Sequence, residues 1–289
     1  MTGAVTLLGV KGGPSLRKGG PIPSSSRLEM AGATFLIDCG VGATRALVEA
    51  GTPLTELDAI FITHLHSDHL LDLGSLLYTA WTSGLRRKID VYGPEGIEAY
   101  WQHFLAAMSF DHGIRTIDDK RAPITDFVEV HTYGADASLT ANGVSVKTFR
   151  VDHPPVTDSF ALRFEAEGAS VVFSADTCYF PPLAGFARGA DLLIHEAMLG
   201  AGIDALVVRI KGAPGLRDHL IASHTMVEDV GRIAAEADVG QLVLNHLVPA
   251  DDPNFSEADW IEAIRQTWDG PVKLGFEGLT VPIKTKVLQ

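Results

Sequence analysis

Short apolar runs alternate along the chain with segments in which apolar residues recur every three or four positions. The first pattern is typical of strands and the second of helices. Strands are predicted at residues 5–10, 33–38, 57–63, 89–92, 127–133, 144–151, 159–165, 170–174, 191–194, 241–245, 272–276 and 279–282. Helices are predicted at 43–50, 70–81, 95–108, 225–237 and 257–268. Residues 11–26 collect glycine, proline and serine and predict a loop, whereas the polar segment 110–123 fits neither pattern.

The order of these elements predicts the fold class. Strands come first in runs and later alternate with helices, and neither an internal repeat nor a linker divides the chain. This order is typical of a layered α/β protein in which sheets lie between helices. Asn142-Gly143 is a turn signal between the strands 127–133 and 144–151. We therefore expect one α/β domain over residues 1–289.

Metal-ligand side chains follow the ends of several predicted strands. The run His64-x-His66-x-Asp68-His69 places three histidines and one aspartate within six residues. Further along the chain, another apolar run precedes each of His153, Asp176, His195-Glu196 and His246. If these strands lie side by side, their imidazole and carboxylate groups converge at one edge of a sheet. Such groups form metal sites with nitrogen and oxygen ligands.

The spacing of these side chains divides them between two ions. Residues two apart in an extended segment point the same way, so His64 and His66 can bind one ion, while Asp68 and His69 face a second. The Asp176 carboxylate has two oxygens and can bridge. We expect one ion on His64, His66, His153 and Asp176, and the other on Asp68, His69, His246 and the same Asp176. The absence of thiolates from this set favours a hydrolytic zinc site over a structural one.

This motif set resembles the metallo-β-lactamase superfamily, and within it the ribonuclease Z and arylsulfatase-like branch. The resemblance extends over nearly the whole chain, in Ser25-Ser26, 35–40, 173–177, 192–197, 223–225 and 242–246. It implies an αββα sandwich with two metal ions, usually zinc, at one edge of the sheets. It also implies a hydroxide between the ions as nucleophile, and a Glu196–His224 pair in which His224 donates the proton. We count Asp68, Glu196 and His224 as catalytic residues.

The chain departs from this branch in one feature that bears on the substrate. Bacterial ribonuclease Z carries a long Gly/Pro-rich arm that grips tRNA, inserted beyond the third histidine. Here only 22 residues separate His153 from Asp176, and they have the pattern of a plain hairpin. The net charge of −13 also disfavours a broad electrostatic grip on a nucleic-acid backbone. The sequence therefore argues against tRNA processing and against nucleic acid as a partner.

A segment rich in aliphatic residues, 200–222, lies between Glu196 and His224 in the sequence. We interpret it as a lid or apolar pocket wall over the site, or as a contact in a homodimer. As a pocket wall it implies a small, partly apolar substrate.

Composition places the protein among ordinary globular proteins, with 46% hydrophobic and 20% charged residues. The two cysteines, Cys39 and Cys178, do not form a disulfide framework in a chain of 289 residues, which favours a reducing compartment. No apolar stretch approaches the roughly 20 residues of a membrane-spanning helix. We expect a cytoplasmic protein without a membrane partner.

These features together predict a dinuclear zinc hydrolase of a small ester-type substrate: a phosphodiester, a sulfate ester, a carboxylic ester or a lactone. Mn²⁺ or iron in place of zinc is left open. One alternative is an iron-dependent oxidoreductase of the same superfamily, although di-iron oxidases tend to carry Glu where this chain has His66. Others are a tRNA 3′-processing endonuclease, disfavoured above, and a metal-binding protein without catalysis.

The remaining histidines are given ordinary structural roles. His103, His112, His131 and His219 fall outside the motif set, and His219 is the least secure of them because it lies in segment 200–222. His195 is left open between a partner of the site and a core residue. Cys178 is interpreted as a buried thiol.

Overall fold

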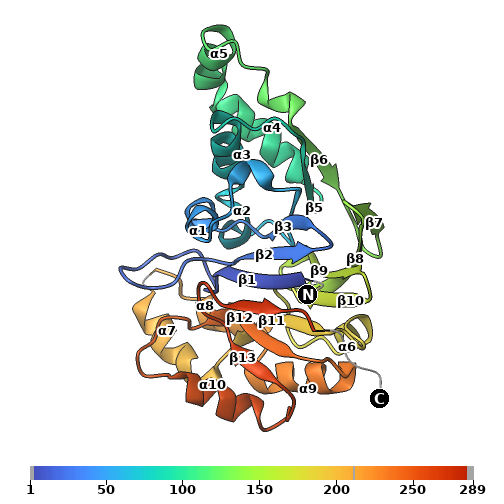
Figure 1. Ribbon diagram of the computed structural model, residues 1–289. Helices are drawn as coiled ribbons and strands as arrows, with labels where there is room; N and C mark the ends of the chain where they lie inside the picture. The colour runs from blue at the N-terminus through green and yellow to red at the C-terminus, as the bar shows by residue number, and fades with distance from the viewer. Residues whose placement is uncertain (1–2, 211, 285–289) are drawn as a thin grey trace.

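Two mixed sheets face each other at the centre of the computed structural model, which describes residues 3–210 and 212–284 (Figure 1). In spatial order, the first sheet contains β14 (Thr280–Pro282), β1 (Gly3–Gly9), β2 (Ser25–Met30), β3 (Ala33–Ile37), β4 (Ala59–Phe61), β5 (Ile89–Gly93) and β6 (Val128–Thr132). The second contains β13 (Val272–Leu274), β12 (Leu242–Val248), β11 (Leu192–Met198), β10 (Ala169–Phe173), β9 (Val156–Ala166), β8 (Val144–His153) and β7 (Ser138–Ala141).

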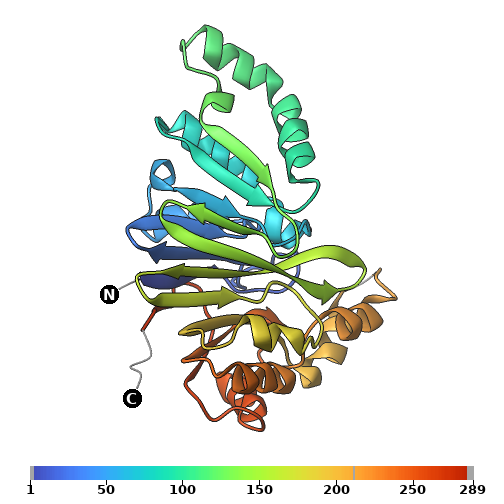
Figure 2. The ribbon, with the colours of Figure 1, turned by 90° about the vertical axis from the view of Figure 1, so that its right-hand side faces the viewer.

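Helices cover the outer face of each sheet, as Figures 1 and 2 show from two directions. The first sheet carries α1 (Ala43–Glu49), α2 (Ser67–Leu70), α3 (Leu73–Thr82), α4 (Ile97–Ala107) and α5 (Ser109–Ile117). The second carries α6 (Pro182–Phe186), α7 (Ile203–Arg209), α8 (Leu216–Ser223), α9 (Val227–Ala237) and α10 (Glu257–Ile264). Short 3₁₀ turns lie at Leu54–Glu56, Ile124–Asp126 and Gly200–Gly202. This mixed α/β arrangement confirms the predicted fold class.

The space between the sheets is filled by large apolar side chains from both of them. Phe61 of β4 packs edge-on against Phe164 of β9, with ring centroids 5.1 Å apart, and both side chains are fully buried. Phe35 of β3 lies 5.9 Å from each of these rings. Because this packing joins the two sheets, it also sets the distance between residues that the sheets carry at their common edge.

The central strands of the second sheet explain why the apolar runs in this part of the sequence are continuous. β10, β11 and β12 pair in parallel, and every residue of each strand is buried. A parallel strand covered by layers on both faces has no solvent side, so its sequence does not alternate. The apolar runs predicted as strands at 170–174, 191–194 and 241–245 therefore mark the middle of the sheet.

Several expected elements differ in detail. The hairpin at Asn142-Gly143 joins β8 to β7, whereas β6 pairs with β5 in the other sheet. The helix expected over 70–81 is two helices, α2 and α3, separated by Leu71 and Asp72. The expected loop 11–26 ends earlier, because Ser25 already begins β2. The unassigned segment 110–123 contains most of α5, a helix without a buried residue, so no core-facing pattern marks it.

Segment 200–222 forms the 3₁₀ turn, α7 and most of α8, apart from residue 211, which lies outside the described residues. Its role as a lid or as a dimer contact stays a prediction. Among the described residues, no helix combines the length and the apolar character that crossing a membrane requires.

Candidate active site

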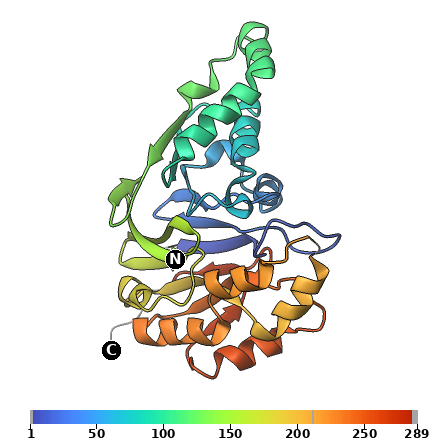
Figure 3. The ribbon, with the colours of Figure 1, turned by 180° about the vertical axis from the view of Figure 1, so that it is seen from behind.

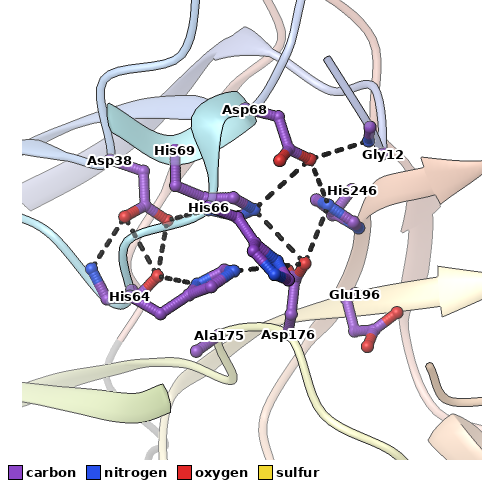
Figure 4. A network of polar contacts seen from close by, with 12 residues as sticks. Gly12, Asp38, His64, His66, Asp68, His69, Ala175, Asp176, Glu196 and His246 are labelled. Atoms are coloured by element: carbon purple, nitrogen blue, oxygen red, sulfur yellow. Dashed lines mark hydrogen bonds and ion pairs between the residues drawn. The ribbon is translucent and has the colours of Figure 1, made fainter. Parts of the chain in front are cut away.

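Side chains from both sheets meet at one edge of the sandwich, where Figure 4 shows them from close by. His64 and His66 lie in the loop after β4, and Asp68 and His69 in α2. The second sheet contributes His153 at the end of β8, Asp176 just after β10, and His246 from β12. All seven residues predicted to bind metal are therefore close together.

The seven residues form two groups that share Asp176. The donor atoms of His64, His66, His153 and Asp176 all lie within 4.8 Å of one another, and so do those of Asp68, His69, Asp176 and His246. These are the two sets that the spacing predicted. We propose both sets as metal sites.

One oxygen of Asp176 contacts histidines of both groups. Its Oδ2 lies 3.8 Å from His64 Nε2 and 3.9 Å from His153 Nε2 in the first group. In the second group it lies 3.3 Å from His69 Nε2 and 3.0 Å from His246 Nε2. The Asp176 carboxylate therefore stands between the groups, where a bridging ligand is expected.

Hydrogen bonds at Nδ1 orient three of the histidines, so that their Nε2 atoms face Asp176. His69 Nδ1 lies 2.7 Å from Asp38 Oδ2, and Thr63 donates its amide and its hydroxyl to the same aspartate. His64 Nδ1 lies 3.1 Å from Thr63 Oγ1. His153 Nδ1 donates to the carbonyl oxygen of Ser223 over 2.8 Å. Partners of this kind fix the ring and select the nitrogen that is left for a metal.

A β-bulge aims His246 at the site. Glu196 of β11 pairs with Asn245 of β12, but the next residue, Ala197, pairs with Leu247, so His246 is an extra residue in β12. Its φ of 41° lies in the left-handed region, as does the φ of 58° at Ala175 beside Asp176. Bulges re-aim a side chain in this way. The sequence predicted His195-Glu196 and His246 after strand ends, whereas these residues lie inside β11 and β12.

The histidines of the site differ in how readily they bind a proton. Burial lowers the pKa of His64 well below its usual value. Burial also acts to lower the pKa of His246, but the Asp176 carboxylate overcomes it and raises that pKa to about 10. Protons on such rings balance the two buried carboxylates, and a divalent cation would compete with them for the same nitrogens.

The side chains at this edge fit metal ions better than they fit one another. His64 Nε2 is buried and has no hydrogen-bond partner among the described residues, and the nearest carboxylate oxygen, Asp176 Oδ2, lies 3.8 Å away. A buried polar atom without a partner is costly, and this one faces a shared carboxylate within a ring of imidazoles. A set of histidine nitrogens and carboxylate oxygens without thiolates is typical of a hydrolytic zinc site.

Glu196 and His224 form a pair beside the second group. His224 Nδ1 lies 3.1 Å from both carboxylate oxygens of Glu196, and the amide of Thr177 donates to the same carboxylate over 2.8 Å. Burial acts to lower the pKa of His224, but Glu196 outweighs it and raises that pKa above its usual value. The His224 ring stacks on His246 with centroids 5.3 Å apart. The pair thus favours the protonated form of His224 next to the proposed metal site.

A pocket of about 340 Å³ opens above the two groups. Its floor is polar, and one wall comes from α7 and α8 and the other from residues 11–15. Lining residues include Lys11, Ser15, His66, Asp68, Leu206, Ile210, Leu216, His219, Leu220, His224 and Val248. His219, given an ordinary role from the sequence, therefore faces this pocket. His103, His112, His131, His195 and Cys178 are not among the lining residues.

Sequence reasoning also missed residues that support the site. Asp38 was predicted as the last residue of the strand 33–38 and lies in a family segment, but it was given no role of its own. In the structure it follows β3, as the other candidates follow their strands. Lys11 lies at the start of the expected loop and had no motif to mark it. The only sequence signal for Lys11 is that it directly follows the first predicted strand, as several of the candidate site residues follow theirs.

The fold and much of the sequence match known proteins. The metallo-β-lactamase fold protein YhfI of Bacillus subtilis has a TM-score of 0.72 at 24% identity, covering 97% of this chain and 99% of YhfI. The short form of human tRNase Z has a TM-score of 0.70 at 23% identity, covering 97% and 99%. Residues 21–208 match the family described as anti-Pycsar protein Apyc1. A ribonuclease Z of Mycolicibacterium gilvum is 35% identical over 277 residues, 94% of this chain and 93% of that protein.

The chain belongs to the metallo-β-lactamase superfamily, in its ribonuclease Z branch. It is a metal-binding hydrolase of that superfamily. This membership confirms the resemblance predicted from the motifs.

The prediction of a small ester-type substrate is wrong, because the relatives that match nearly the whole chain are ribonucleases Z. An absent arm does not distinguish this chain from the Mycolicibacterium gilvum relative. The match covers 94% of this chain and 93% of the Mycolicibacterium gilvum protein, so that ribonuclease Z carries no long insertion that this chain lacks. The net charge of −13 describes the whole surface, whereas a scissile phosphate contacts only a few groups, so the net charge does not exclude RNA as a substrate.

Replacing Asp176 tests the shared carboxylate. Asp176→Asn should hold fewer than one metal ion per chain after zinc loading and gel filtration, because both groups lose their common charged oxygen. His66→Ala should keep about one of the wild type's two ions, because His66 belongs only to the first group. Asp158→Asn changes a carboxylate that pairs with Arg150 on the surface, and it should bind zinc like the wild type. Two ions retained in Asp176→Asn, measured by elemental analysis, would contradict the shared site.

Proposed function

We propose that the chain is a zinc-dependent ribonuclease of the ribonuclease Z type, which hydrolyses a phosphodiester bond in RNA. The observation that carries the proposal is the 35% identity to a ribonuclease Z over 94% of the chain. Precursor tRNA is the first RNA to consider, because human tRNase Z shares the fold over 97% of this chain. This proposal replaces the expectation that nucleic acid is not a partner.

The two groups that share Asp176 would hold the ions. His64, His66 and His153 would complete the first site, and Asp68, His69 and His246 the second. Two such ions, when bound, supply an activated water and offset the negative charge of the reacting phosphate. Asp38 and Thr63 keep the imidazoles of His69 and His64 turned toward Asp176, where they would hold the ions.

His224 supplies the proton that the leaving oxygen needs. Glu196 contacts Nδ1 of His224 and favours the protonated ring. Since Nδ1 is held by Glu196, the other ring nitrogen, Nε2, is available on the pocket side, where His224 lines the wall. Thr177 fixes the Glu196 carboxylate through its amide, so the pair is oriented before the substrate binds. General acids of this kind contribute about 10²- to 10⁴-fold to a rate.

Cleavage of RNA by the metal-loaded protein tests the substrate class. Protein stripped with a chelator should cleave a precursor tRNA at least about a thousandfold more slowly, because ions supply several kcal/mol of charge stabilisation and each 1.36 kcal/mol is tenfold. Adding zinc back should restore cleavage, and the Asp176→Asn variant should stay inactive. Turnover restricted to small esters, with no cut in any RNA, would reject the proposed function.

The role of His224 is tested with two leaving groups. His224→Ala should lower kcat/KM for RNA by about 10²- to 10⁴-fold, because the alkoxide that leaves must be protonated. With an aryl phosphodiester such as bis(p-nitrophenyl) phosphate, whose leaving group departs without a proton, the loss should be less than about tenfold. His112→Ala, on a histidine of α5, serves as the control and should match the wild type. Equal losses on both substrates would remove His224 as the proton donor.

A further inference from the structure

Lys11 carries a buried positive charge on the wall of the pocket. The residue is 5% exposed, and its Nζ donates to the carbonyl oxygens of Gly12 and Gly13 over 3.2 and 3.3 Å, and to Ser15 Oγ over 3.1 Å. All three acceptors are uncharged. Among the described residues, no carboxylate lies within 4.0 Å of this ammonium group.

The two carboxylates that act to raise the pKa of Lys11, Asp251 and Asp68, have other partners. Asp68 Oδ2 accepts from the Gly13 amide over 2.8 Å and lies 3.3 Å from His246 Nε2. Asp251 pairs with Arg17 over 2.8 Å and with Arg209 over 3.7 Å, and Asp252 pairs with Arg209 over 3.4 Å. Burying a charge without an opposite charge is costly. Consistent with that cost, burial lowers the pKa of Lys11. An anion that binds in the pocket would supply the missing partner.

The loop that holds Lys11 is fastened to the proposed metal site. The amide of Gly13 donates to Asp68 Oδ2 over 2.8 Å, while the carbonyl oxygen of the same residue accepts from Lys11 Nζ. At Gly12, a Cβ atom would come within 2.9 Å of the His246 ring, so the backbone packs directly on that ligand. An anion bound to Lys11 would therefore lie beside the second group.

The opposite wall of the pocket is apolar. Leu206 and Ile210 from the α7 region and Leu216 and Leu220 from α8 line it. Figures 1 and 3 show α7 and α8 lying next to the long loop after β1, the loop that contains Lys11. A volume of about 340 Å³ lies in the range of ligand pockets, roughly 300–1,000 Å³. An apolar face opposite a lysine suits a ligand with a flat apolar part and an anionic part.

We propose that this pocket binds one nucleotide next to the scissile phosphate, with Lys11 on a phosphate group of the RNA and the α7–α8 wall on the base. The assignment to RNA rests on the proposed function, whereas the nucleotide chemistry rests on the pocket. Lys11 is then a positioning residue. It holds the strand equally in the ground state and in the transition state, so its loss affects KM rather than kcat.

Binding of free nucleotides to the zinc-loaded protein tests the pocket without turnover. By titration calorimetry, AMP should bind about tenfold more tightly than ribose 5-phosphate, because only AMP brings a base to the apolar wall. Bound ions would contact the phosphate of both ligands equally, so the ratio of the two affinities measures the contribution of the base to binding. Equal affinities, or no binding of either ligand, would overturn the proposal.

Two pairs of variants separate the two halves of the pocket. Lys11→Met should weaken AMP and ribose 5-phosphate alike, by about tenfold, whereas Lys18→Met on the exposed part of the same loop should not. Leu216→Ser should lower the ratio of the two affinities, whereas Ile221→Ser, an exposed residue of the same helix, should not. If Leu216→Ser unfolds at a much lower temperature than the wild type, Ile210→Ser tests the same apolar wall. Indistinguishable results for a variant and its control would overturn the proposal.

Cleavage of RNA then separates this inference from the proposed function. Lys11→Met should raise KM for the precursor tRNA about tenfold and leave kcat within about threefold. An unchanged KM would show that the pocket serves a free nucleotide and would contradict the assignment to RNA. If the nucleotides bind as expected but no RNA is cut, the proposed function fails while the nucleotide pocket stands.

Discussion

One carboxylate oxygen, Asp176 Oδ2, is the point on which the site depends. It lies within 3.0 to 3.9 Å of four buried imidazole nitrogens, two in each group of ligands. Burying this carboxylate among several imidazole nitrogens costs free energy unless a cation, either a proton or a metal ion, binds between them. The neighbouring structure is arranged around this constraint. Asp38, Thr63 and the carbonyl oxygen of Ser223 fix three rings, and the bulge in β12 turns His246 toward the same oxygen.

The two sheets have to be packed correctly for this arrangement to exist. His64 to His69 follow β4 of the first sheet, while His153, Asp176 and His246 belong to the second. The aromatic contact between Phe61 and Phe164 joins β4, which leads to His64, to β9, which pairs with the strands that lead to His153 and Asp176. The fold therefore brings two half-sites together, and the pocket above them combines a wall from α7 and α8 with a wall from the loop after β1.

The sequence allowed the candidate ligands, which the fold brings together, to be picked out because their signal is local. His64 to His69 are contiguous, and His153, Asp176 and His246 each follow or lie in an apolar run. What the pattern could not show depends on contacts between distant segments. The left-handed conformation of His246 arises from the register of β12 against β11. The helix α5 has no buried residue, so its sequence carries no core-facing pattern. The substrate was predicted wrongly because an absent arm and a net charge describe the surface, whereas a ribonuclease Z matches 94% of this chain over 93% of its own length.

Zinc-loaded crystals measured at the zinc absorption edge test the central claim most directly. The anomalous difference map should show two peaks per chain, about 3.5–4 Å apart, on the two sides of the Asp176 carboxylate. One peak should be bounded by His64, His66 and His153, and the other by Asp68, His69 and His246. A single peak, or two peaks that do not share Asp176, would contradict the account.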